Sequence, residues 1–286
     1  MKEDILKKVR RIEIKTRGLS HDIFAGKYHS AFKGRGMSFS EVRDYRIGDD
    51  IRDIDWNVTA RSSKPHIKIY EEERELTMML LVDVSGSGNF GTQTMLKRQC
   101  ATEIAAVLAF SAAQNNDKIG CIFFTDRIEK YVPPKKGKQH VLRIISDLVD
   151  FQPESRGTDV GVALKFFASV VKKRCTAFLL SDLISPSFEE PLKIASGKHD
   201  LVALRVYDSR EEELPNVGII EMRDSETSRK VWVDSASRKV RQQYAESYRT
   251  RTEATERLML KNRVDTVNIA TSDDYVAALI KLFKMR

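Results

Sequence analysis

Oxygen-bearing side chains gather directly after an apolar stretch in the first third of the chain. Residues 78–82 are all apolar, and Asp83, Ser85 and Ser87 follow within five positions. A short uninterrupted apolar run is typical of a strand buried on both faces of a parallel sheet. Ligands of open α/β sheets bind just beyond the carboxyl ends of the strands, and Mg²⁺ prefers oxygen ligands. These side chains are therefore candidate metal ligands, although Asp and Ser are also ordinary turn residues.

Two later positions supply the same kind of ligand. Thr158 lies in a short polar loop before a segment of helical periodicity, and Asp182 follows the apolar run 177–180. The carboxyl ends of parallel strands meet at one edge of a sheet, so these donors are expected to converge. We therefore predict a Mg²⁺ or Mn²⁺ site formed by Asp83, Ser85, Ser87, Thr158 and Asp182. Because three of the five donors are neutral hydroxyls, the ion would remain attractive to a carboxylate from another molecule.

The elements that must position these residues follow an alternating pattern. From residue 76 onward, apolar runs alternate with helix-periodic segments, which predicts an α/β fold with a doubly wound, mostly parallel sheet. The predicted strands are 78–82, 118–125, 177–182, 201–206 and 266–269. The predicted helices are 93–115, 139–149, 162–172, 188–195, 237–262 and 274–284. A hairpin is expected from 218–223 and 230–233, and an exposed turn region at 128–137.

The first 75 residues differ in character, and we predict that they pack on the main domain of residues 76–286. Residues 2–17 have the period of an amphipathic helix, and 37–42 and 66–70 alternate like short strands. Between these strands, acids and arginines alternate densely. This pattern favours arginine–carboxylate pairs that hold one loop conformation, and the alternative is an acidic cluster that binds a cation or a basic partner. The residues of this charged segment are Arg43, Tyr45, Asp49, Asp50, Arg52, Asp55, Trp56 and Arg61.

The charge balance raises the question of a nucleic-acid partner. The 286-residue chain has a formal net charge of +8, yet its acidic residues are interspersed almost everywhere and no nucleic-acid-binding motif accompanies them. We therefore expect a well-solvated surface and no nucleic-acid partner. The basic helix predicted at 237–262 has two open interpretations, a solvated face or a docking surface for an acidic partner.

Cysteine and histidine usage argues against other kinds of site. The three cysteines lack the spacing of a zinc or redox motif and are expected to be buried, reduced thiols, and the five histidines are scattered. No stretch is apolar enough for a membrane span or a secretory signal, which predicts a cytoplasmic protein.

Two parts of the sequence resemble known families. The motif Asp83-x-Ser85-x-Ser87, followed by Thr158 and Asp182, resembles the metal-ion-dependent adhesion site of von Willebrand factor type A domains. The stretch from Gly34 to Arg61 resembles the signature of the bacterial domain of unknown function 58 family. The first resemblance implies an ion that binds an acidic side chain of a protein partner and performs no chemistry. The second implies an adaptor associated with MoxR-type AAA+ ATPases in the assembly or maturation of protein complexes.

An enzymatic alternative must be weighed against this interpretation. In aspartyl-phosphate phosphatases a nucleophilic Asp also ends the first strand of such a sheet. That chemistry usually needs a second acid two residues later as proton donor, and this position is Ser85. The sequence also shows no Ser-His-Asp set and no phosphate-binding Gly loop with Lys. We therefore predict a binding module rather than an enzyme.

Overall fold

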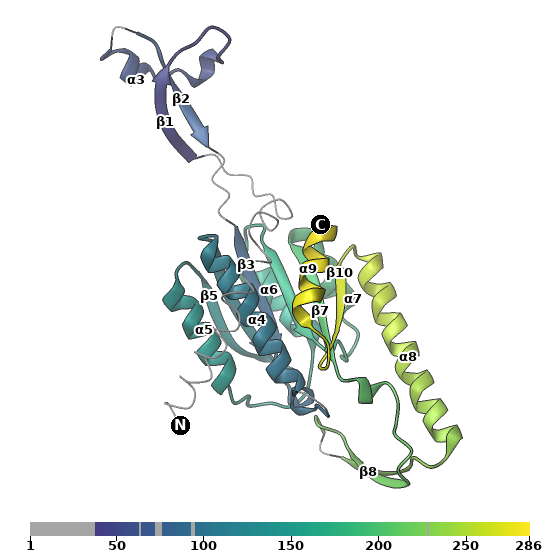
Figure 1. Ribbon diagram of the computed structural model, residues 1–286. Coiled ribbons are helices and arrows are strands. Elements are labelled where there is room, and N and C mark those ends of the chain that lie inside the picture. The colour runs from purple at the N-terminus through teal and green to yellow at the C-terminus, as the bar shows by residue number, and fades with distance from the viewer. Residues whose placement is uncertain (1–37, 63, 72–75, 93–94, 228) are drawn as a thin grey trace. The chain divides into compact units, whose positions relative to one another are not determined.

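The computed structural model describes residues 38–62, 64–71, 76–92, 95–227 and 229–286. These residues form two compact units, a smaller one that ends at Leu76 and a larger one from Thr77 to Arg286 (Figure 1). The helix predicted at 2–17 lies outside the described residues, and the packing of the first segment on the main domain stays a prediction.

The smaller unit is built on a two-stranded antiparallel sheet, β1 (Ser38–Asp44) with β2 (His66–Glu71), at the two places where short strands were predicted. A 3-10 helix (Ile51–Asp53) and the short helix α3 (Trp56–Thr59) lie between the strands. Asp49 accepts two hydrogen bonds from the Arg43 guanidinium, both at 2.8 Å. Asp55 accepts hydrogen bonds from the first backbone N–H groups of α3. Charged side chains therefore hold this loop in one conformation.

The larger unit is organised around a six-stranded sheet with the order β10-β7-β6-β3-β4-β5. Every neighbouring pair is parallel except β4 with β5. The predicted doubly wound, mostly parallel sheet is therefore confirmed. The strands are β3 (Thr77–Asp83), β4 (Lys118–Phe124), β5 (Ile128–Lys135), β6 (Thr176–Ser181), β7 (Asp200–Tyr207) and β10 (Asp265–Ala270).

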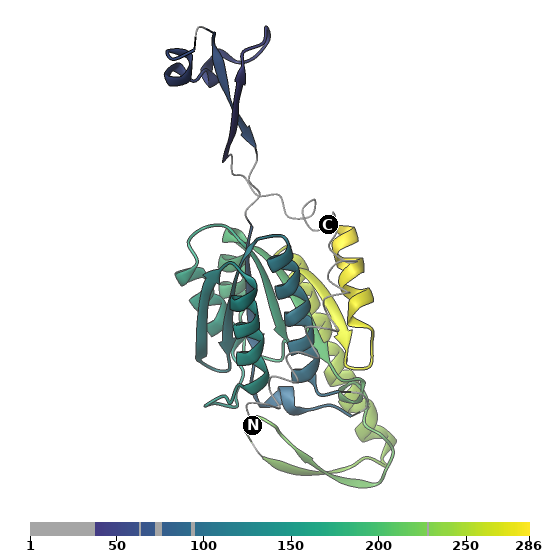
Figure 2. The same ribbon diagram turned by 60° about the vertical axis from the view of Figure 1, so that its left-hand side comes forward.

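Helices cover both faces of this sheet. Met79 and Leu81 of β3 pack in one apolar cluster with residues of α6, α7 and α8. The opposite face carries α4, α5 and α9, as Figures 1 and 2 show, and Phe178 of β6 lies 6.3 Å from Phe283 of α9 between ring centroids. The helices are α4 (Lys97–Gln114), α5 (Lys138–Asp150), α6 (Val160–Val170), α7 (Glu189–Lys198), α8 (Arg238–Lys261) and α9 (Tyr275–Met285). Because both faces are covered, β3 is apolar from Met78 to Val82, as expected of a strand at the centre of a parallel sheet.

The prediction of an exposed turn region at 128–137 is wrong. Residues 128–135 form β5, which pairs antiparallel with β4 at the edge of the sheet. Pro133 and Pro134 misled the prediction, because proline cannot donate a ladder hydrogen bond and is usually a turn signal. An edge strand tolerates proline where its N–H would point away from the sheet.

The C-terminal part follows the prediction closely. A separate hairpin, β8 (Ile219–Arg223) with β9 (Lys230–Asp234), precedes the long helix α8. Only Tyr248 and Met259 are buried among the 24 residues of α8. The three cysteines are buried free thiols, as predicted. Among the described residues, no helix has both the length and the apolar character needed to span a membrane.

Candidate metal centre

The first three predicted ligands lie in the turn that follows β3. Asp83 ends the strand, and its carboxylate accepts a hydrogen bond from the Ser85 backbone N–H at 2.9 Å. The Ser85 and Ser87 hydroxyl oxygens are 3.1 Å apart. Ser181, the last residue of the neighbouring strand β6, donates its hydroxyl to the second Asp83 oxygen at 2.7 Å. The Asp83 side chain is therefore held in one orientation, with two hydroxyls beside it.

Thr158 reaches the same edge of the sheet from the loop before α6. The Gly86 backbone N–H donates to the Arg156 carbonyl at 2.9 Å, which joins this loop to the Ser85–Ser87 turn. Asp159 begins α6 by accepting a hydrogen bond from the Val162 N–H. The Thr158 hydroxyl is itself bonded to a residue that was not predicted, and donates to the Glu226 carboxylate at 2.6 Å.

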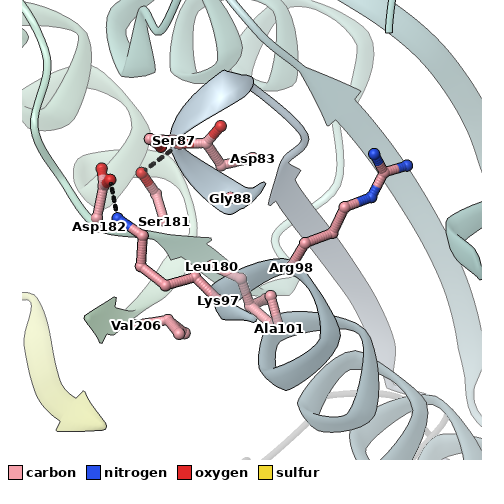
Figure 3. A pocket seen from close by; sticks show the side chains of 10 residues that line it. All are labelled: Asp83, Ser87, Gly88, Lys97, Arg98, Ala101, Leu180, Ser181, Asp182 and Val206. Carbon is pink, nitrogen blue, oxygen red and sulfur yellow. Dashed lines mark hydrogen bonds and ion pairs between the residues drawn. The ribbon is translucent and has the colours of Figure 1, made fainter. Parts of the chain in front are cut away.

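Asp182 directly follows β6, which is the parallel neighbour of β3, so the two predicted carboxylates follow adjacent strands. One Asp182 oxygen accepts the Ile184 N–H at 3.1 Å. The other accepts the Lys97 ammonium at 2.8 Å, and the same ammonium bonds Glu211 at 2.6 Å. Figure 3 shows Lys97 extended from the start of α4 to Asp182, while the neighbouring Arg98 points away from both carboxylates.

Burial and mutual repulsion shape the charge of this centre. Burial, and then the nearby Asp182 carboxylate, raise the pKa of Asp83 to about 6 against the opposing hydrogen bonds from Ser85 and Ser181. Burial also raises the pKa of Glu226, and Asp182 adds to that shift. Lys97 behaves differently, because Asp182 and Glu211 outweigh burial and raise its pKa, so it stays charged. The centre therefore concentrates negative charge that its single buried ammonium only partly offsets.

The donor set fits a hard divalent cation. Asp83, Ser87 and Asp182 line one small cavity of about 20 Å³, room for a particle about the size of one water molecule. Carboxylate and hydroxyl oxygens are the ligands that Mg²⁺ and Mn²⁺ prefer. Within the described part of the chain, no group of three or more His, Cys, Asp or Glu side chains is arranged to hold a metal. A metal at this place would therefore depend on the hydroxyl ligands as well as the two carboxylates.

The residues missed from the sequence come from segments far from the motif. Lys97 is 85 residues from Asp182, and Glu226 is 68 residues from Thr158. No local pattern marks either of them, since a lysine in the first turn of a helix and a glutamate in a hairpin turn are common. Ser181 was accessible to sequence reasoning, because it precedes Asp182 at the end of the same apolar strand.

A second hollow, of about 230 Å³, lies between the end of β6 and α8. Its wall includes Arg205, which is only 5% exposed and donates to the Tyr248 hydroxyl at 2.6 Å and the Thr252 hydroxyl at 3.1 Å. The Arg205 guanidinium also lies 5.0 Å from the centre of the Tyr207 ring. Part of the long helix is therefore anchored to β7 by a buried arginine.

Residues 41–254 match the family described as "Protein of unknown function DUF58". The chain belongs to this family. This DUF58 protein is 31% identical over 236 residues to "Uncharacterized protein Rv1480" of Mycobacterium tuberculosis, a match that covers 80% of this chain and 74% of that protein.

Solved structures resemble the DUF58 chain in fold at low sequence identity. An aerotolerance-related membrane protein from Bacteroides fragilis is 15% identical, and the match covers 74% of this chain and all of that chain with a TM-score of 0.50. A von Willebrand factor type A protein from Catenulispora acidiphila is 13% identical, and the match covers 77% of this chain and 43% of that chain with a TM-score of 0.38.

Proposed function

We propose that this DUF58 protein is a non-catalytic, metal-dependent module for binding another protein. Mg²⁺ or Mn²⁺ would be held by Asp83, Ser85, Ser87, Thr158 and Asp182, and a carboxylate of the partner would complete the coordination. The observation that supports the proposal is a set of hydrogen bonds around the Asp83 turn. The Ser85 and Ser87 hydroxyls contact each other, and Ser181 at the end of β6 donates to Asp83. The turn is also bonded to the loop that carries Thr158. These are hard oxygen donors, only two of them anionic, at the edge where open α/β sheets bind ligands.

The chain's own residues would prepare the centre for this role. Ser181 and the Ser85 N–H orient the Asp83 carboxylate. Lys97 and the Ile184 N–H donate hydrogen bonds to the Asp182 carboxylate, and the positive charge of Lys97 offsets part of the negative charge of Asp182. A bound divalent ion would supply an electrophilic centre that is incompletely neutralised by the protein. Such a centre favours an added anionic ligand, which is the property an adhesion site requires.

The phosphatase alternative lacks its usual proton donor, an acid two residues after the nucleophilic Asp. Ser85 occupies the position of the general acid, and the nearest ammonium, Lys97, is only 3% exposed and bonded to two carboxylates. A group held in this way cannot approach a leaving group. Turnover of acetyl phosphate or p-nitrophenyl phosphate that disappears in Asp83→Ala would contradict the proposal that the module performs no chemistry.

Metal binding itself is tested by calorimetry with MgCl₂ and MnCl₂. We expect binding to the wild-type protein that is lost in Asp83→Ala and retained in Asp150→Ala, which changes an exposed acid at the end of α5. Circular dichroism should show that all three proteins are folded. Equal metal binding to the wild type and to Asp83→Ala would show that Asp83 is not a metal ligand.

The partner we propose is a MoxR-type AAA+ ATPase, with the DUF58 protein acting as an adaptor in the cytoplasm during assembly or maturation of protein complexes. The proposal rests on the family and on a site that favours an acidic side chain. Pull-down with the purified ATPase of the same organism, in Mg²⁺ and in EDTA, provides the test. Retention in Mg²⁺ alone supports the metal-bridged contact, whereas equal retention in EDTA moves the interface elsewhere.

A further inference from the structure

The turn that joins β8 and β9 reaches the candidate metal centre. Its residue Glu226 accepts the hydroxyl of Thr158, one of the five proposed ligands, at 2.6 Å. Glu226 is partly buried, whereas Ser225 and Thr227 on either side of it are exposed. Glu226 is therefore the turn residue that contacts the Thr158 loop, and it adds a carboxylate to the oxygen donors of the site.

Local hydrogen bonds hold this turn in its shape. One oxygen of Asp224 accepts the backbone N–H groups of Glu226 and Thr227, at 2.9 and 3.2 Å. The other oxygen accepts the Thr227 hydroxyl at 2.7 Å. The side chain of Glu226 is thus presented by a preformed turn, so it loses little conformational freedom when it reaches Thr158.

The motif itself leaves space for the turn. Gly86 lies between the two motif serines, and a Cβ atom added there would be 2.5 Å from the Ser225 carbonyl oxygen and 3.3 Å from the Arg156 carbonyl oxygen. Any side chain at position 86 would therefore collide with the β8–β9 turn. This close approach is independent of the Glu226 hydrogen bond, and both place the turn against the ligands of the site.

The charges explain why a cation would draw these groups together. Asp83 and Asp182 line one small cavity, and Glu226 is bonded to Thr158, whose loop is joined to the Ser85–Ser87 turn. Carboxylates close together in a partly buried place repel one another, and a bound cation would reduce that repulsion. The nearby ammonium of Lys97 is bonded to Asp182 and to Glu211.

We propose that Glu226 is an internal carboxylate ligand of the divalent ion, and that it takes the coordination position that the proposed function gives to the partner. This inference rests on the proposed function. In the protein without its partner, the β8–β9 hairpin would close the site. A partner carboxylate would then have to displace Glu226, so that binding and movement of the hairpin are coupled.

The test compares wild type, Glu226→Gln and Glu221→Gln. The glutamine keeps an oxygen that can accept the Thr158 hydroxyl but removes the charge, and Glu221, on strand β8 of the same hairpin, is paired with Lys230 at 2.6 Å and serves as control. We expect Mg²⁺ affinity to fall about 10-fold or more in Glu226→Gln, at least the loss seen when outer-shell groups of metal sites are removed. The affinity of Glu221→Gln should match the wild type.

Hydrogen exchange supplies a readout of the hairpin. Mg²⁺ should slow exchange in the β8–β9 hairpin of the wild type and leave it unchanged in Glu226→Gln. Added acetate, a small carboxylate that competes for the same position, should reverse the wild-type protection. Protection that persists at saturating acetate would overturn the competition with a partner.

Two results separate this inference from the proposed function. If Asp83→Ala loses Mg²⁺ while Glu226→Gln binds it like the wild type, with unchanged hairpin exchange, Glu226 is not a ligand and the proposed function stands. If the wild-type protein binds neither Mg²⁺ nor Mn²⁺, both proposals are overturned.

Discussion

The ammonium of Lys97 lies 2.8 Å from the Asp182 carboxylate, and both side chains are almost fully buried. The same ammonium bonds Glu211 at 2.6 Å. A buried cation between two carboxylates links the start of α4 to the ends of two strands of the sheet. It also places a fixed positive charge beside the candidate metal centre, where it limits how strongly Asp182 can attract an ion.

Replacing this cation should destabilise the protein strongly. Lys97→Met leaves Asp182 and Glu211 buried without their partner, which typically costs about 3–5 kcal/mol of the free energy of unfolding. Urea denaturation in EDTA measures the loss. Lys261→Met is the matched control, because its pair with Glu189 is exposed and such pairs contribute about 0–1 kcal/mol. Equal losses in the two variants would show that the buried pair has no special role.

The metal-free protein should lose stability as the pH rises through the range of Asp83. The folded state raises the pKa of Asp83 to about 6, above its ordinary value of 3.8, so between these values the folded protein holds a proton that the unfolded chain releases. The stabilisation from the protonated group is complete below the lower value and disappears above the higher one, a change of about 2–3 kcal/mol.

Urea denaturation in EDTA at several pH values between 4 and 7 tests this dependence. Asp83→Asn has no titrating group at this position, so its stability should vary less with pH over that range than the stability of the wild type. Parallel curves for the two proteins would assign the pH dependence to other groups.

Affinity for an identified partner should depend on the motif hydroxyls. The double variant Ser85→Ala and Ser87→Ala removes two neutral ligands, so the ion should bind more weakly and the partner carboxylate should lose the ion that it contacts. Losing one side of a buried charged contact typically costs about 2–5 kcal/mol, which corresponds to roughly thirtyfold to several thousandfold in Kd. Surface plasmon resonance in Mg²⁺ and in EDTA should give the same weak binding for the double variant.

The contrasting variant is Arg249→Gln on α8, where the arginine is exposed and lies 3.8 Å from Glu253. A surface charge of this kind mainly changes the association rate and its salt dependence. A loss for Arg249→Gln as large as for the double serine variant would point to α8 as the main interface.

The charged loop between β1 and β2 should resist proteolysis while the Arg43–Asp49 pair is intact. Arg43 bonds both oxygens of Asp49, and a lysine cannot reproduce that geometry. We expect trypsin to cut at Arg46 and Arg52 more slowly in the wild type than in Arg43→Lys. Mass spectrometry of the early fragments identifies the cut sites. Wild-type cleavage there as fast as in urea-unfolded protein would show that the pairs do not order the loop.

The sequence alone determined the sheet, most of its helices and the edge where oxygen donors gather. Apolar periodicity is local, so β3, β4, β6, β7 and β10 and the helices between them could be located without a structure, and Asp83 and Asp182 could be assigned to the carboxyl ends of strands. The prediction from the sequence failed at β5, because proline is usually a turn signal. Only the sheet order shows that this strand lies at an edge, where proline is tolerated.

The tertiary structure decided which groups surround the predicted ligands. Lys97 meets Asp182 and Glu211, and Glu226 meets Thr158, across 68 to 114 residues of chain. Such pairings depend on how helices and a hairpin pack against the sheet, and no repeating pattern records them. The charge at the candidate centre is set by these distant groups, since in a buried place each charge acts on its neighbours through little intervening water.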